Sequence, residues 1–114
     1  MNIFTDVSFN KSTKVKSTRL DTWLNNNDQI SDIDIMWVDV NGGEREFIEG
    51  ALNTLQNRVK YLYIEFNGVQ GKKLYEDCLT ADGIKDKLEC FEELGIYNFM
   101  GNFGNIFLKN INKD

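Results

Sequence analysis

At 114 residues, the chain has the length of one domain, and its formal net charge of -5 argues against nucleic-acid binding, which requires a basic surface, and against binding to anionic membranes. Hydrophobic residues at 41% and charged residues at 27% are typical of soluble globular domains and exclude wholesale disorder. The absence of histidine excludes Ser-His-Asp catalysis, Cys-His catalysis and histidine-ligated metal centres.

The N-terminal residues 1–12 show no clear period and are interpreted as a lead-in that either covers a sheet edge or stays flexible, ahead of one domain over 13–114. Met1–Phe9 lacks a charged leader and a long apolar run, which predicts a cytoplasmic protein. Cys78 and Cys90 lie too far apart for a CxxC pair, so no metal site is expected.

The first elements predicted are an edge strand over Thr13–Thr18, from its alternating residues, and a short helix around Leu20–Leu24 with Asp21 as its N-cap. Ile33–Val40 contains a continuous apolar run, as expected of a strand covered on both faces. After Asn41-Gly42-Gly43, apolar residues from Phe47 to Leu55 recur at helical spacing.

A second strand is predicted at Val59–Phe66, so strand, helix and strand form a parallel crossover unit. Ile84, Leu88, Phe91 and Leu94 then recur at the spacing of a helix ending at Gly95, and residues 96–109 read as a β-hairpin with glycines at its turn. The prediction is an α/β fold with helices on both faces of a mostly parallel sheet that ends in an antiparallel hairpin.

Ligands of open α/β sheets bind beyond the carboxyl ends of the strands, which makes Asp39–Glu44 the first candidate site. Asp39 has the chemistry of a hydrogen-bond acceptor or a base, and Glu65 would lie beside it if the strands pair in parallel. Two alternatives remain open. In the first, Gly42 and Gly43 only make the turn, Asp39 caps it and Glu44 complements the helix dipole. In the second, Glu65 is a strand-end carboxylate that faces water.

The segment from Asp34 to Glu44 (Asp-Ile-Met-Trp-Val-Asp-Val-Asn-Gly-Gly-Glu) resembles the signature of FkbM methyltransferases. Leu20-Asp21, Ile48-Glu49-Gly50-Ala51, the strand ending at Glu65 and the stretch Gly104–Leu108 also resemble parts of that family in the same order. The similarity covers roughly residues 13–110, with Asn41 and Gly43 as departures from the usual residues.

This resemblance implies a partial Rossmann-like, class I methyltransferase sheet whose cofactor is S-adenosylmethionine and whose acceptor is a sugar or another small molecule. Asp39 and Glu65 would be catalytic, whereas Asn41, Gly42 and Glu44 would contact the cofactor. The family's glycine-rich cofactor loop has no counterpart here, because no glycine precedes Gly42.

The alternative function is a non-catalytic remnant or interaction module. A sheet without its first strands exposes the edge of Ile33–Val40, so we expect that edge to be covered by residues 1–18, by a homodimer or by a complementing chain.

Overall fold

The computed structural model describes residues 12–27, 29–40, 42–66, 73, 76, 88–99 and 102–114, with side chains except at 97–99, 102 and 103. Its described elements begin with helix α1 (Leu20–Asn25), strand β1 (Ile33–Val38) and helices α2 (Glu44–Gly50) and α3 (Leu52–Arg58). Strands β2 (Val59–Glu65), β3 (Phe91–Phe99) and β4 (Asn102–Asn110) follow.

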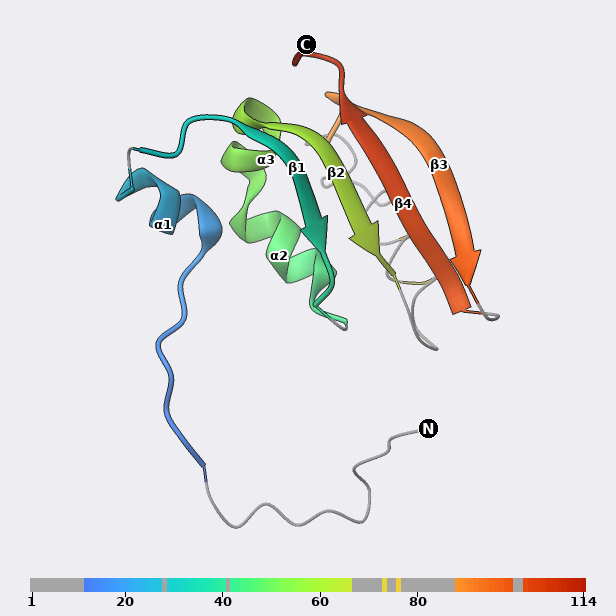
Figure 1. The fold of residues 1–114 in the computed structure, drawn as a ribbon. Helices are drawn as coiled ribbons and strands as arrows, with labels where there is room; N and C mark the ends of the chain where they lie inside the picture. The colour runs from blue at the N-terminus through green and yellow to red at the C-terminus, as the bar shows by residue number, and fades with distance from the viewer. Residues whose placement is uncertain are drawn as a thin grey trace.

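The strands form one four-stranded sheet in the order β1-β2-β4-β3 (Figure 1). β1 and β2 are parallel, as predicted, whereas β4 runs antiparallel to both of its neighbours, β2 and β3. The expectation of a mostly parallel sheet is therefore wrong. The reason is that β3 and β4 form a hairpin, which reverses the chain direction, and β4 inserts beside β2.

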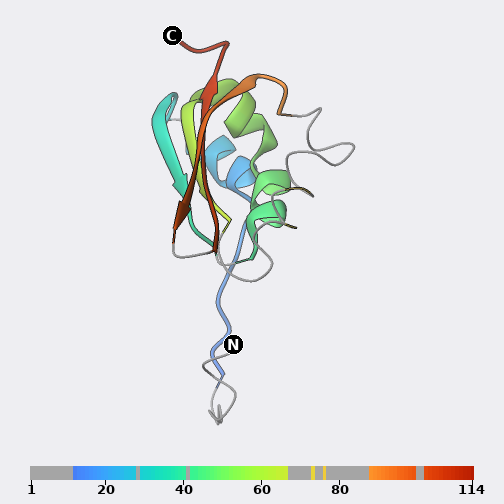
Figure 2. The ribbon, with the colours of Figure 1, turned by 90° about the vertical axis from the view of Figure 1, so that its right-hand side faces the viewer.

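The three described helices lie on one face of the sheet, and the opposite face carries none of them (Figure 2). The expectation of helices on both faces is thus wrong for the described residues. The core lies between sheet and helices, where β2 contributes Leu62 and Ile64 and the helices contribute Ile48 and Leu55, all fully buried. Alternation along β2 turns its remaining side chains toward the open face.

Two predicted elements differ from the structure. Residues 12–19 form no strand and run away from the sheet (Figure 1), because no other strand pairs with them. The predicted helix ending at Gly95 is wrong from Phe91 onward, where the chain is already strand β3, and its part at 82–87 lies outside the described residues. A register shift between Glu93 and Gly95 displaces Leu94 from regular alternation, which explains why its apolar spacing resembles that of a helix.

The helix predicted over Phe47–Leu55 is divided at Ala51. Side chains at the start of α1 bond to the backbone groups that lack helical partners at this break. In an unbroken helix the N–H of Asn53 would bond to the carbonyl of Glu49. Instead, the Arg19 guanidinium donates to the Glu49 carbonyl at 2.8 Å, and the Asp21 carboxylate accepts from the Asn53 N–H at 3.0 Å. Asp21 also accepts from the Thr54 N–H and hydroxyl, so it caps α3, not its own helix as predicted.

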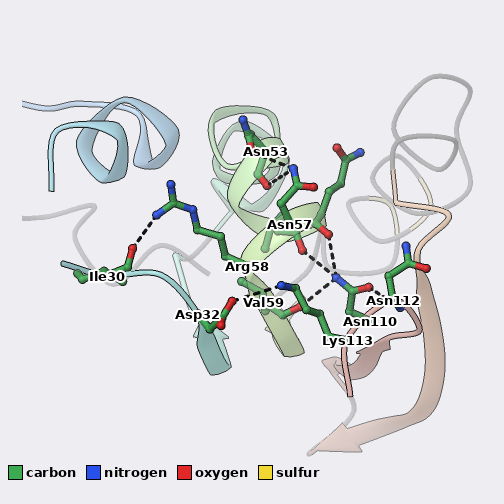
Figure 3. A network of polar contacts seen from close by, with 11 residues as sticks. Ile30, Asp32, Asn53, Asn57, Arg58, Val59, Asn110, Asn112 and Lys113 are labelled. Carbon is green, nitrogen blue, oxygen red and sulfur yellow. Dashed lines mark hydrogen bonds and ion pairs between the residues drawn. The ribbon is translucent and has the colours of Figure 1, made fainter. Parts of the chain in front are cut away.

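A buried asparagine closes the other end of α3 (Figure 3). The side-chain amide of Asn110 is fully buried and donates toward the carbonyls of Leu55, Gln56 and Val59, at 3.3, 3.0 and 3.0 Å. Its Oδ1 accepts from the backbone N–H of Asn112 at 3.0 Å. One side chain from β4 thereby donates to two carbonyl groups, those of Leu55 and Gln56, that the end of α3 leaves without helical partners, and to the first carbonyl of β2.

Candidate functional site

The parallel pairing of β1 and β2 brings two predicted site residues to one end of the sheet. Val38 lies opposite Ile64, and Asp39 and Glu65 directly follow them in the chain. Asp39 is exposed and Glu65 is partly buried, opposite Asn105 of β4. The carboxyl ends of the parallel strands therefore present two carboxylates in neighbouring positions, with the start of α2 at the same end (Figure 1).

The turn between β1 and α2 depends on a glycine. Gly42 has φ of 100°, a conformation in which other L residues are strained, and a Cβ added there would meet no atom within 4 Å. The N–H of Gly43 closes the turn by donating to the Val40 carbonyl at 3.3 Å. The third predicted residue of the turn, Asn41, lies outside the described residues. Space above Gly42 is thus open to a ligand.

Glu44, the first residue of α2, is buried to a degree that its sequence position did not indicate. Its exposed fraction is 1%, and its Oε2 atom is buried without a hydrogen-bond partner in the described structure. Burial of a carboxylate oxygen without a donor is unfavourable. The Oε2 atom of Glu44 can therefore accept a hydrogen bond from a donor outside the described residues.

A second buried polar atom lies two strands away from β1. Asn105 donates from Nδ2 to the Tyr63 hydroxyl at 2.9 Å, while its Oδ1 is buried and has no hydrogen-bond partner in the described structure. Sequence reasoning missed both residues, because their meeting depends on β4 lying next to β2. Asn105 extends the polar row that begins with Asp39 and Glu65 across the end of the sheet.

The described residues were also compared with the requirements of metal sites and of membrane-spanning helices. They contain no group of three or more His, Cys, Asp or Glu side chains placed to hold a metal ion. Over the same ranges, none of the helices has the length and apolar character needed to cross a membrane.

Comparison with known proteins identifies the family of the chain. Residues 4–104 match the model of the methyltransferase FkbM domain. The chain belongs to this family. It is also 32% identical over 104 residues to the 2-O-methyltransferase NoeI of Sinorhizobium fredii (strain NBRC 101917 / NGR234). That match covers 91% of this chain but only 40% of the relative, so the chain spans well under half of the relative's length. No solved structure gives a significant match.

Proposed function

We propose that this chain forms the acceptor-binding part of an S-adenosylmethionine-dependent O-methyltransferase that acts on a hydroxyl of a sugar or a similar small molecule. The observation that supports the proposal is the parallel register of β1 and β2, in which Val38 lies opposite Ile64, so that Asp39 and Glu65 follow paired residues at the carboxyl ends of the two strands, where open α/β sheets bind ligands. Family membership supplies the reaction type, and the relative's name specifies transfer to an oxygen.

Asp39 is the proposed general base. Its carboxylate is exposed, so it can reach an acceptor hydroxyl and take the proton as that oxygen becomes a nucleophile. Glu65 is partly buried beside Asn105 and is proposed to hold the acceptor by accepting a hydrogen bond from a second hydroxyl. A polyhydroxylated acceptor has both the hydroxyl that reacts and the hydroxyl that Glu65 is proposed to bind.

The β1–α2 turn is the proposed contact with the cofactor. S-adenosylmethionine, when bound, supplies an electrophilic methyl group on a sulfonium. The buried Oε2 of Glu44 lacks a donor, and Gly42 leaves open space where a side chain would stand, so the turn fits a ligand that donates a hydrogen bond and approaches the backbone closely. Asn41 belongs to the same proposed contact.

Calorimetric titration of the 114-residue chain with S-adenosylhomocysteine tests the cofactor contact. We expect saturable binding with one ligand per chain, weakened by Glu44→Gln and unchanged by Glu46→Gln, which alters an exposed carboxylate two residues later in α2. Absence of binding at millimolar ligand would overturn the assignment of this turn to the cofactor.

The base is tested separately by methyl transfer to a panel of sugars. Asp39→Asn should lower kcat by about 100-fold, in the range typical of a lost general base, while S-adenosylhomocysteine binding persists. Asp34→Asn, a change at an exposed carboxylate of β1, is the matched control and should leave kcat unchanged. Equal activity of the Asp39→Asn variant and the parent chain would exclude Asp39 as the base.

A further inference from the structure

A shallow hollow lies on the open face of the sheet, opposite the helices, and large apolar side chains line it: Ile35, Trp37, Tyr63 and Phe107. Its volume is about 380 Å³, within the range of about 300–1,000 Å³ that is usual for small-molecule sites. Such sites combine an apolar lining with a few polar groups that fix the orientation of the ligand. The polar groups next to the hollow therefore indicate which ligand it can bind.

The first polar feature is the contact between Asn105 and Tyr63. Asn105 Nδ2 donates to the Tyr63 hydroxyl at 2.9 Å, so the hydroxyl proton is left to bond to another acceptor, and the described residues contain none for it. Asn105 Oδ1 is buried and has no donor in the described structure, a cost that a purely structural side chain would avoid. The pair therefore directs one proton, that of Tyr63, toward a ligand.

The second polar feature is the pair of carboxylates at the same end of the sheet. Alternation along β2 places Glu65 on the same face as Tyr63, and Glu65 lies opposite Asn105. Trp37 precedes Asp39 by two residues, which is the spacing of side chains on one face of a strand. The hollow is thus continuous with the proposed acceptor site.

A saccharide ring matches both parts of this arrangement. Many pyranoses carry C–H groups on one face, and the slightly positive hydrogens of these groups are attracted to the negative face of an aromatic ring. Trp37 offers such a ring, because its side chain is 66% exposed. The hydroxyls of a sugar both donate and accept hydrogen bonds. They suit carboxylates and a phenol hydroxyl, whereas the negative charge of Asp39 and Glu65 repels anionic ligands such as nucleotides.

We propose that Trp37, Tyr63 and Asn105 form the subsite that recognises the saccharide ring of the methyl acceptor. The Trp37 indole packs against the C–H face of the ring, and the Tyr63 hydroxyl donates to a ring hydroxyl. Asn105 is a positioning residue, because its amide keeps the Tyr63 proton directed at the ligand. The inference rests on the proposed function, since it places the ring beside Asp39, and it adds the residues that select one sugar epimer over another.

Saturation-transfer NMR of the 114-residue chain tests the indole platform. The probes are the methyl glycosides of glucose, galactose and mannose, which differ in the configuration of one hydroxyl. We expect saturation transfer to the ring C–H protons of at least one glycoside, and its loss in Trp37→Ala. Trp23→Ala is the matched control, because it removes the 45% exposed tryptophan of α1, and transfer should persist. Absence of transfer from the parent chain to all probes at tens of millimolar would overturn the inference.

The polar pair is tested by the preference between epimers. Tyr63→Phe keeps the ring and removes the donor, so the ratio of affinities for the preferred and the least preferred glycoside should fall about fivefold to tenfold, as for one lost hydrogen bond. Asn105→Asp puts an acceptor where Nδ2 donates, which turns the Tyr63 proton away from the ligand and should cause the same loss while transfer persists. Equal affinity of the parent chain for all probes, or an unchanged ratio in either folded variant, would overturn the role of the pair.

A second copy of the chain is the competing occupant of the hollow. The net charge of -5 on each copy opposes close association, so we expect a Trp23→Phe variant to sediment as a monomer at micromolar concentration, with Trp37 readily quenched by acrylamide. A dimer in which Trp37 is protected would overturn the inference.

Failure of the subsite can be told from failure of the proposed function. Saccharide binding that depends on Trp37, without binding of S-adenosylhomocysteine or methyl transfer, would count against the function alone. Methyl transfer that depends on Asp39 but keeps its KM and its choice of epimer in Trp37→Ala and Tyr63→Phe would count against the subsite alone.

Discussion

The sheet has one face packed against helices and one face without them, and the two faces carry different side chains. On the covered face, Leu62 and Ile64 are fully buried beneath α2 and α3. On the other face, Trp37 of the edge strand is 66% exposed, and Tyr63 contacts it as part of an aromatic row. Apolar content alone therefore does not distinguish the faces, since both are rich in large apolar residues.

The polar groups of the chain show the same contrast. On the covered side, Asp21 and Asn110 satisfy backbone groups at the two ends of α3. Two buried oxygens have no partner in the described structure: Glu44 Oε2 at the start of α2, and Asn105 Oδ1 on β4 opposite Glu65. The capped ends of α3 thus stabilise the packing of the helices, whereas Glu44 and Asn105 are the places in the described structure where a buried oxygen still lacks a donor.

The largest expected effect is a difference in the free energy of unfolding between a substitution on the covered face and one on the open face. Leu62→Ala removes a fully buried side chain and should lower the free energy of unfolding by about 3 kcal/mol, the usual range for a core leucine. Trp37→Ala removes a larger but exposed side chain and should lower it by about 1 kcal/mol or less. Urea unfolding followed by far-ultraviolet circular dichroism measures both, and equal losses would show that Trp37 is as much part of the core as Leu62.

The second prediction concerns the buried amide at the end of α3. Asn110→Ala leaves the carbonyls of Leu55, Gln56 and Val59 without their donor and should lower the free energy of unfolding by about 2 kcal/mol. Asn57→Ala is the control, because within the described residues its amide donates to Asn53 on the exposed side of the same helix, and its loss should change stability by about 0.5 kcal/mol or less. Comparable losses in the two variants would contradict the capping role.

The third prediction concerns the break between α2 and α3. Asp21→Ala removes the acceptor for the N–H groups of Asn53 and Thr54 and should lower the free energy of unfolding by about 1 kcal/mol, as for a lost N-cap. Asp34→Ala is the control, because it removes an exposed carboxylate of β1 and should have little effect. Amide hydrogen exchange at Asn53 and Thr54 should accelerate only in the Asp21 variant.

The sequence allowed prediction of those parts of the fold in which local pattern and tertiary environment agree. The apolar run from Ile35 to Val38 and the aromatic and branched residues of β2 predicted the parallel pair correctly, because β-branched and aromatic residues suit a sheet. The expectation that this run is covered on both faces is wrong for the described residues, because β1 is the terminal strand and Ile35 and Trp37 are exposed. The hairpin of β3 and β4 was also predicted, but Gly104, which was expected at its turn, lies within β4, which already begins at Asn102. Leu20 to Leu24 form the expected helix, but Asp21 caps α3 and not this helix.

Features that depend on contacts distant in sequence could not be predicted. The burial of Glu44 and the meeting of Asn105 with Tyr63 follow from how strands far apart in the chain align. Phe91 to Leu94 was read as helix because a register shift in β3 breaks the alternation that identifies strands. The roles of Asp39, Glu65, Gly42 and Glu44 stay proposals, since strand register and turn geometry give their positions and not the molecules that they bind.

The smallest expected effect comes from an exposed ion pair next to the buried amide of Asn110 (Figure 3). Lys113 Nζ lies 3.3 Å from Asp32 Oδ1, but the Asp32 side chain is 73% exposed, so water and salt screen the attraction. Lys113→Ala should lower the free energy of unfolding by about 0.5 kcal/mol or less, and a double-mutant cycle with Asp32→Ala should give a coupling that vanishes at about 1 M salt. A coupling near that of the buried Asn110 contacts would mean that solvent does not reach this pair, and that burial is not what separates the strong from the weak polar contacts in this chain.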